Sequence, residues 1–248
     1  MKILTDFHTH TIYSRRNHAK GTIRENIESA ISKGLKELWI TDHGPGHFGY
    51  GILRENFPKV RKEIDELNKE YEGRIKIYFG VEANVMDYDG KIDVREEEKQ
   101  YLDGINVGFH YGIVPRGIKA FTYFLIINPL SKILPFMRNW IKEKNTDALI
   151  NIVNNHDIKI ITHPSDKVRV NIERLAGVCE TRGTALEINS SHKHMNEEDI
   201  KQALKTNVLI SVGSDAHTPE DVGEFEVALK RIENTETPYE RIINLKEV

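Results

Sequence analysis

The sequence predicts an α/β barrel of parallel strands. Strand-like and helix-like runs alternate almost throughout the 248 residues, which is typical of parallel βα units rather than of a sandwich or a helical bundle. Short phrases that contain histidine or a carboxylate follow most of the strand-like runs. In a barrel the loops after the strands converge on one face, whereas an open doubly wound sheet brings only the central strand ends together. The repeated polar phrases therefore favour the barrel.

Seven strands and six helices are expected, in alternating order. The strands are apolar, β-rich runs at residues 2–7, 36–41, 75–81, 104–109, 158–162, 184–189 and 207–212. The helices are expected at residues 22–33, 54–71, 146–156, 171–181, 196–205 and 219–232. Polar residues that can cap the free amides of a helix start are Thr22, Asn196 and either Asn145 or Thr146. Barrels of this length commonly form one domain, so residues 1–248 are expected to be a single domain.

Nine side chains in these phrases are candidate metal ligands. They are His8, His10, His18, His43, Glu82, His110, His163, Asp215 and His217. All of them except His18 lie at the end of an expected strand, and together they include seven of the eleven histidines. A single HxH pair would be weak evidence, but the repetition at successive strand ends predicts a metal site.

The types of ligand indicate which metals and which chemistry to expect. Imidazoles and carboxylates without a thiolate suit zinc, manganese or iron, and Cys179, the only cysteine, lies in a helix-like run. Glu82 is the one glutamate among the strand-end histidines and is expected to bridge two cations. Two such cations lower the pKa of a shared water and hold a phosphoryl group between them. The sequence therefore predicts a multinuclear metallohydrolase.

The ordered phrases resemble those of the polymerase and histidinol phosphatase (PHP) family. The phrases are DFHTHT, ITDHGP, GVEAN, GFH, THP, EINSS and GSDAH, and the resemblance extends from Met1 to about Ile232. NHAKGT, GVEANVMDYDG, ALEINSS and GSDAHT, followed by GEFE, are most similar to the YcdX-type phosphatases of that family, which contain three zinc ions. The resemblance implies a distorted, TIM-like (β/α)7 barrel with the metal site at the C-terminal ends of the strands.

The resemblance also implies three sets of ligands and a reaction. His8, His10, Glu82 and Asp215 would hold the first metal; Glu82, His110 and His163 the second; and His18, His43 and His217 the third. Three divalent cations are expected, zinc in the first place, with manganese or iron as alternatives. The implied reaction is attack of a metal-bound hydroxide on a phosphate monoester of a small molecule, with Glu82 and Asp215 as catalytic residues.

Other polar residues lie near these phrases. Asp6 is expected either to orient a ligand or to bind backbone amides. Three arginines are candidates for binding a phosphorylated substrate, namely Arg15, Arg16 and Arg116. Three further histidines are extra candidates at the rim of the site, although each is expected to be a surface residue: His47, His192 and His194.

Residues 116–145 depart from the alternating pattern. This segment is apolar and aromatic and is interrupted by Pro129 and Pro135, which makes it too broken for an ordinary membrane span. A helical insertion packed on the barrel, a mobile lid over the metal site, a contact between two copies of the chain, and a contact with a membrane surface all remain open.

The net charge and the N-terminal residues bear on the expected partners, function and location of the protein. Lys and Arg (35) nearly balance Asp and Glu (38), so nucleic acid is not an expected partner. A phosphodiesterase or 3′–5′ exonuclease, a histidinol phosphatase, an amidohydrolase and a noncatalytic module are the alternatives to a general phosphatase. The N-terminus begins with a strand-like run and has no apolar signal region, so a cytoplasmic enzyme is expected.

Overall fold

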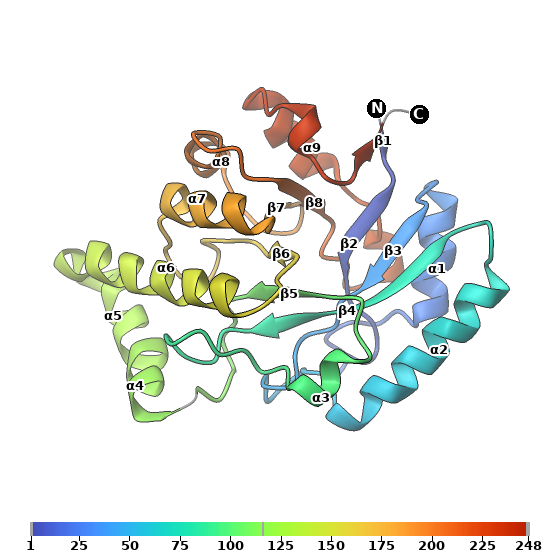
Figure 1. The fold of residues 1–248 in the computed structure, drawn as a ribbon, viewed down its shortest axis with the longest axis horizontal. Helices are drawn as coiled ribbons and strands as arrows, with labels where there is room; N and C mark the ends of the chain where they lie inside the picture. Colours follow the sequence, from blue (N-terminus) through green and yellow to red (C-terminus); the bar gives the residue numbers. More distant parts are fainter. Residues whose placement is uncertain (1, 116, 247–248) are drawn as a thin grey trace.

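The computed structural model describes residues 2–115 and 117–246, and its centre is a seven-stranded parallel sheet. The strands are β2 (Thr5–Thr9), β3 (Glu37–Ile40), β4 (Lys76–Asn84), β5 (Gly104–Gly108), β6 (Ile160–Ile161), β7 (Ala185–Asn189) and β8 (Ile210–Gly213). Their order across the sheet is their order in the chain, and every neighbouring pair is parallel. Helices surround the strands (Figure 1). The expected distorted, TIM-like (β/α)7 barrel is confirmed.

The barrel closes between its first and last strands without a regular ladder. At the C-terminal ends, Thr9 and Ala216 form an isolated parallel bridge, and the His10 amide donates to the Ala216 carbonyl over 2.8 Å. Lower in the seam, the buried Asn244 side chain donates to the carbonyls of Thr5 and Val212 over 2.8 and 2.7 Å. The Val212 amide donates to the Asn244 side chain over 3.1 Å. Asn244 thus replaces part of the missing ladder.

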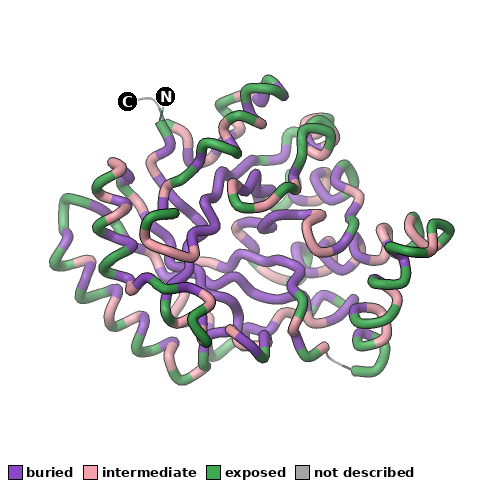
Figure 2. Tube along the Cα trace, turned by 180° about the vertical axis from the view of Figure 1, so that it is seen from behind, coloured by how far each residue is buried: buried purple, intermediate pink, exposed green. Residues whose placement is uncertain are grey.

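Helices cover the outside of the barrel. They are α1 (Ile23–Ser32), α2 (Phe57–Glu70), α3 (Glu96–Lys99), α7 (Ile172–Arg182), α8 (Glu197–Ala203) and α9 (Glu226–Asn234), with 3₁₀ turns at Arg54–Asn56, Pro219–Asp221 and Tyr239–Arg241. Thr22 and Asn196 cap α1 and α8, as predicted, and in the structure each forms a complete capping box. The exposed sides of the helices face outward and the strands are buried (Figure 2).

Two apolar layers support the strands. The larger layer lies between strands and helices and includes Phe57 and Phe79, which are both fully buried. A smaller cluster includes Phe7 and Trp39. A Cβ placed on Gly80 would lie 3.1 Å from Trp39, and Gly80 shares its face of β4 with Glu82 because side chains alternate along a strand. Trp39 therefore fills the barrel interior below Glu82.

The chain between β5 and β6 forms the insertion. It contains α4 (Gly117–Thr122), a π-helical turn (Tyr123–Ile127), α5 (Asn128–Ile133), a 3₁₀ turn (Pro135–Met137) and α6 (Arg138–Asn155). Figure 1 shows α4 and α5 at one side of the barrel, next to α6. In the described part of the chain, no helix is both long enough and apolar enough to cross a bilayer.

The start of α6 was predicted wrongly. The helix begins at Arg138, so Asn145 and Thr146 lie inside it rather than at its N-terminal cap. These two polar side chains can lie inside the helix because both form hydrogen bonds within the fold. The Asn145 side chain accepts a hydrogen bond from Tyr88 over 2.9 Å, and the Thr146 hydroxyl donates to the Lys142 carbonyl.

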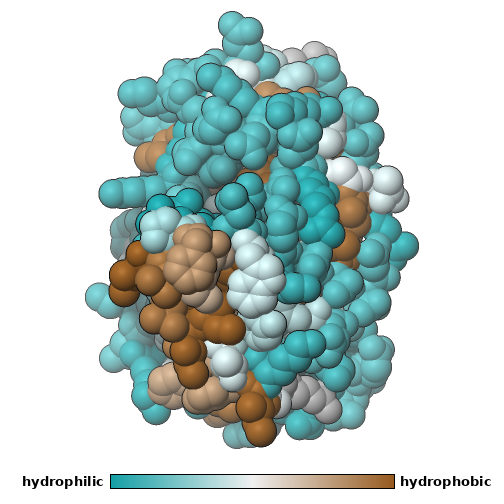
Figure 3. Space-filling model, turned by 90° about the vertical axis from the view of Figure 1, so that its left-hand side faces the viewer, coloured by the Kyte–Doolittle hydropathy of each residue, from teal (hydrophilic) through white to brown (hydrophobic). Residues whose placement is uncertain are grey.

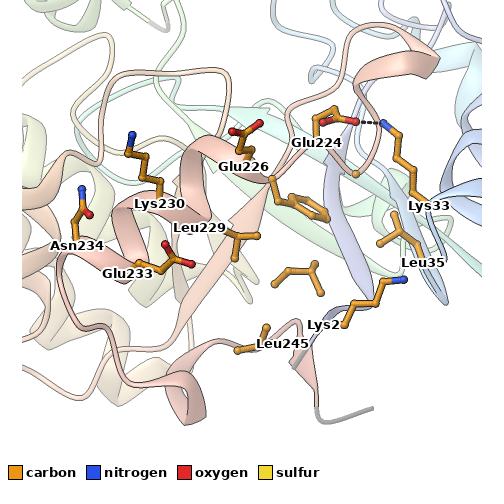
Figure 4. A pocket seen from close by; sticks show the side chains of 13 residues that line it. Lys2, Lys33, Leu35, Glu224, Glu226, Leu229, Lys230, Glu233, Asn234 and Leu245 are labelled. Atoms are coloured by element: carbon orange, nitrogen blue, oxygen red, sulfur yellow. Dashed lines mark hydrogen bonds and ion pairs between the residues drawn. The ribbon is translucent and has the colours of Figure 1, made fainter.

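One small sheet was not predicted at all. It pairs β1 (Lys2–Ile3) with β9 (Leu245–Lys246) in antiparallel register. A cavity of about 680 Å³ lies beside this sheet and is lined from α9 and from the region before β3 (Figure 4). None of the nine candidate ligands lines this cavity, which places it away from the expected metal site.

Candidate metal centre

The nine candidate ligands lie together at the C-terminal ends of the strands. His8 and Glu82 lie within β2 and β4, and the other strand-end ligands lie one to four residues beyond the ends of their strands. His18 reaches the same place from the loop after β2. Seven of the nine residues are buried, while His18 and His217 are half-buried. The barrel thus brings His10 within 3.1 Å of Asp215, which is 205 residues away in the chain.

The atoms of the first expected set surround one point. His10 Nε2 lies 3.1 Å from both His8 Nε2 and Asp215 Oδ1. His8 Nε2 lies 3.4 Å from Glu82 Oε2 and 3.4 Å from Asp215 Oδ1, and His10 Nε2 lies 3.8 Å from Glu82 Oε2. Atoms that bind a four-coordinate zinc at its usual bond lengths are roughly 3.3 to 3.6 Å from one another. This set therefore has the spacing of a cage for one small cation.

The other oxygen of Glu82 faces the second expected set. Glu82 Oε1 lies 2.9 Å from His163 Nε2 and 3.2 Å from His110 Nε2, and it accepts a hydrogen bond of 2.6 Å from the Thr162 hydroxyl. The two oxygens of one buried carboxylate therefore face two different groups of imidazoles. This arrangement suits a carboxylate that bridges two cations.

The third expected set is more open to solvent. His18 Nε2 lies 3.1 Å from His217 Nε2, and the His18 ring stacks on Tyr50 at a centroid distance of 3.7 Å. The His43 ring lies 5.1 Å from the His18 ring. His43 also faces the first set, because its Nδ1 lies 2.9 Å from Glu82 Oε2. His43 therefore connects the third set with the carboxylate.

Buried polar atoms without hydrogen-bond partners are concentrated in this centre. Among the described residues they include His10 Nδ1, both ring nitrogens of His43, Glu82 Oε2 and His110 Nε2. A buried polar atom left without a partner costs about 1–3 kcal/mol, so several such atoms in one place call for a ligand. The donor set, imidazole nitrogen and carboxylate oxygen, fits divalent transition metals.

The electrostatics of the centre favour ionised carboxylates and neutral rings at His10 and His18. His8 is the exception, because burial opposes its protonation but Glu187, Asp215 and Glu82 outweigh burial and hold its pKa well above the usual value in the absence of a metal. Burial, followed by the charge of His217, lowers the pKa of His10 to about 3, and the same two causes lower the pKa of His18 to about 4. Burial opposes ionisation of Glu82, but His110, His8 and His43 outweigh it and hold the pKa of that carboxyl well below its usual range. Neutral imidazole and ionised carboxylate are the forms that bind metals.

Two further side chains orient the ligands, and the sequence reasoning did not single them out. Glu187, in β7, accepts a hydrogen bond of 2.8 Å from His8 Nδ1–H and another of 2.8 Å from the His163 amide. The Asn84 side-chain oxygen accepts from His110 Nδ1–H over 2.8 Å. Partners of this kind fix the ring and leave the other nitrogen free for a metal. The strand-end position of Glu187, in the phrase ALEINSS, was the signal that could have found it.

His192 and Asp166 extend the centre on one side. His192 Nε2 lies 3.1 Å from Asp215 Oδ2, and His192 Nδ1 lies 3.2 Å from Asp166 Oδ2. Burial lowers the pKa of His192, but the hydrogen bonds to Asp166 and Asp215 outweigh it and raise that pKa to about 9. The expectation of a surface role for His192 is wrong, because the side chain is three-quarters buried against a candidate ligand.

The other polar residues singled out in the sequence are Asp6, the three arginines and two rim histidines, and they differ in burial and in contacts. Asp6 is fully buried and accepts from the amides of Ser214 and Gly223, which agrees with a role in binding backbone. Arg15 donates to loop carbonyls, including that of Gly51 over 2.5 Å, and Arg16 is exposed. Arg116 lies outside the described residues. The His194 side chain is exposed, as expected of a surface residue. The same expectation is wrong for His47, which is buried and faces the Tyr111 carbonyl.

Backbone geometry also marks the site. His163 and Asp215, each two residues beyond a strand end, have φ angles of 28° and 55°. Positive φ is uncommon for residues other than glycine, and such strained residues concentrate at functional sites. Both side chains are thereby directed at the centre by a backbone conformation that the rest of the fold must maintain.

Known proteins are similar to this chain in sequence and in fold. Residues 6–191 match the PHP domain. The chain is 34% identical to a probable phosphatase of Thermoanaerobacter pseudethanolicus, covering 98% of this chain and 91% of that one. It is 31% identical to a probable phosphatase of Shewanella frigidimarina, covering 98% and 90%.

A solved structure with a similar fold is histidinol phosphate phosphatase from Lactococcus lactis subsp. lactis, in complex with zinc, L-histidinol and phosphate. The TM-score is 0.63 at 18% sequence identity, and the match covers 94% of each chain. At this identity the likeness is one of fold. The family match and the two phosphatase relatives carry the assignment, so the chain belongs to the PHP domain family.

Proposed function

We propose that this protein hydrolyses phosphate monoesters of small molecules at a centre of several divalent cations. The class of enzyme is supported by the relatives named probable phosphatases, which match almost the whole chain. The geometry of the site is compatible with this chemistry, because phosphoryl transfer depends mainly on positioning and on neutralising charge.

One observation carries the proposal. The two oxygens of the buried Glu82 face different groups of histidines, with Oε1 toward His110 and His163 and Oε2 toward His8 and His43. Oε1 also accepts from the Thr162 hydroxyl, but the buried Oε2 has no hydrogen-bond donor among the described residues, whereas a purely structural carboxylate would have donors on both oxygens. A bridging carboxylate is the arrangement that holds two cations close enough to act on one phosphoryl group.

We assign the ligands in three sets. His8, His10, Glu82 and Asp215 form the first; Glu82, His110 and His163 form the second; and His18, His43 and His217 form the third. Zinc is the cation we propose, because the donors are imidazoles and carboxylates. When bound, these cations supply positive charge to the phosphate oxygens and lower the pKa of a water molecule.

The chain's own residues organise the reaction. Glu187 holds the Nδ1 proton of His8 and so aims Nε2 at the centre, and Asn84 does the same for His110. Arg16, exposed on the loop that also carries His18, is our candidate for the part of the substrate that does not react, since a guanidinium pairs well with phosphate.

A panel of phosphate monoesters tests the function. It should include a chromogenic aryl phosphate, several sugar phosphates and histidinol phosphate, each assayed with zinc, manganese, iron and magnesium. We expect hydrolysis of several monoesters after loading with a transition metal. Hydrolysis of histidinol phosphate far above all others would narrow the function to a histidinol phosphatase. Cleavage of oligonucleotides or diesters in preference to every monoester would contradict the proposal.

A further inference from the structure

The outer surface of the insertion is unusually apolar. The described residues contain sixteen large hydrophobic side chains that are exposed, and ten of them lie between positions 111 and 140. Ile118, Ile133 and Phe136 are 87%, 75% and 81% exposed. We call the outer surface formed by residues 118–140 the apolar face. Figure 3 shows hydrophobic side chains gathered on the side of the molecule that carries α4 and α5.

The helices of the insertion are oriented with their apolar side outward. On α4, the π-helical turn and α5, the exposed side chains include Ile118, Phe121 and Leu125. The spacing of three to four residues places them on one side of the helix. The side turned to the protein buries Ala120, Phe124, Asn128 and Ser131. A helix that only packs on a barrel has the opposite arrangement, with its apolar stripe toward the core.

Hydrogen bonds hold this orientation in place. The Asn128 side-chain amide donates to the Tyr88 hydroxyl over 3.1 Å, and the Asn145 amide donates to the Asn128 side-chain oxygen over 2.8 Å. All three residues are buried. Turning the helix to bury its apolar side would break this network and leave its polar groups without partners, which is costly. The outward apolar face is therefore specified by the fold.

The charge of the same segment is strongly positive. Residues 117–142 contain four basic residues, Lys119, Lys132, Arg138 and Lys142, and no acidic residue. The rest of the chain contains 31 Lys and Arg against 38 Asp and Glu. Positive charge is thus concentrated around the apolar face of a protein that is otherwise negative. Trp140, which is 45% exposed, belongs to the class of residue that favours the boundary between lipid and water.

We propose that the apolar face docks on an anionic membrane surface, with α4 and α5 lying in the plane of the lipid headgroups. Interfacial helices combine apolar side chains on one side with flanking Lys and Arg, and anionic lipids attract such basic segments. A second copy of the chain fits less well. A symmetric contact between two such faces would oppose the four basic residues of one chain to those of the other.

Docking there would hold the metal centre near the lipid surface. The insertion begins directly after His110, and Lys132 of α5 donates to the Tyr111 hydroxyl over 2.8 Å. The segment that contacts lipid is therefore tied to the loop that carries a candidate ligand. The proposal itself concerns binding and does not depend on the proposed phosphatase activity.

Sedimentation of the full chain with lipid vesicles tests the proposal. We expect binding to vesicles that contain phosphatidylserine, much weaker binding to vesicles of phosphatidylcholine alone, and a loss of binding as ionic strength rises from about 0.1 M to about 1 M. No binding to the anionic vesicles, or equal binding to both kinds, would overturn the proposal.

Variants locate the contact. Combining Ile118→Ser, Ile133→Ser and Phe136→Ser should weaken binding at least about tenfold, because stable binding needs apolar burial at the interface in addition to the attraction of the basic residues to anionic lipid. Val227→Ser with Tyr239→Ser removes exposed apolar side chains elsewhere and should bind as the unmodified protein does. Equal binding by all three proteins would contradict the proposal, provided that circular dichroism and metal content show them to be equally folded.

Light scattering without lipid tests whether the apolar face binds a second copy of the chain instead. We expect the unmodified protein and the triple variant to have the same mass in solution. If the unmodified protein formed dimers and the triple variant were monomeric, the apolar face would be a contact between copies of the chain, and membrane docking would be wrong.

Discussion

At the scale of single residues, the position of Glu82 determines what the centre can do. Its carboxylate is fully buried, is surrounded by imidazoles on both oxygens and has a pKa well below the usual range because the histidine charges outweigh burial. A negative charge maintained in this position favours the binding of cations, and in the proposed bridging role its two oxygens would keep two cations close to each other.

Replacing this carboxylate should therefore abolish catalysis. We expect Glu82→Gln to lower kcat on an aryl phosphate by roughly a thousandfold or more, because a neutral amide cannot bridge two cations. The melting temperature of the metal-free protein should stay close to that of the unmodified chain. Near-normal turnover by a variant with its full metal content would show that Glu82 does not bridge.

Glu187 should act through His8 rather than directly. We expect Glu187→Gln to weaken metal binding or activity by about 10 to 100-fold, the usual effect of losing a partner that orients a ligand. Glu197→Gln changes an exposed carboxylate on α8 and should leave both quantities unchanged. Equal metal affinity in the two variants, measured by competition with a chelator, would argue against the orienting role.

His192 should make the stability of the metal-free protein depend on pH. Its pKa is raised from 6.5 to about 9 despite burial, because Asp166 and Asp215 favour the charged ring. The stabilisation is therefore complete below pH 6.5 and is lost as the pH rises through about 9. We expect the unfolding free energy of the unmodified chain to exceed that of His192→Gln at pH 6, and the difference to shrink by pH 9.5. A difference that grew with pH in urea titrations would contradict this sign.

The candidate ligands could be predicted from the sequence, whereas their supporting residues could not. Histidines and carboxylates that recur after strand-like runs are visible as a pattern. Glu187 and His192 depend on which loops face each other across the barrel, which the sequence alone does not state. His47 shows the same limit, since its burial arises from a contact with Tyr111, 64 residues away.

At the scale of elements, alternation and capping predicted most helices and strands. The misplaced start of α6 has a physical cause, because Asn145 is a polar residue buried in a helix through tertiary hydrogen bonds. Capping rules interpret such a residue as a helix start. The pairing of β1 with β9 joins two strands of two residues each, which leaves too short a pattern to recognise.

The seam of the barrel gives a prediction at this scale. We expect Asn244→Ala to lower the unfolding free energy by about 2 to 4 kcal/mol, because the carbonyls of Thr5 and Val212 and the Val212 amide would lose their partner. Asn234→Ala, on the exposed end of α9, should change stability by less than about 0.5 kcal/mol. Similar denaturation midpoints for the two variants would show that Asn244 does not stabilise the seam.

At the scale of the whole molecule, the barrel explains why candidate ligands so distant in sequence lie together. The C-terminal ends of the seven parallel strands lie on one face, and the closure between β8 and β2 places the last candidate ligands of the chain next to the first. The orientation of the apolar face could not be predicted from sequence patterns. The outward orientation of the apolar face results from the contacts of Asn128 with Tyr88 and Asn145, which no local pattern reveals.

The central claim is that the nine ligands form a multinuclear metal centre on which phosphatase activity depends. The most direct test measures the metal content per chain by elemental analysis, together with hydrolysis of an aryl phosphate, before chelation, after chelation and after zinc is returned. We predict close to three metals per chain, with activity lost on removal and restored on return, and one metal fewer in His18→Ala. Full activity in a protein stripped of metal, or a single metal per chain under zinc-replete conditions, would contradict the account.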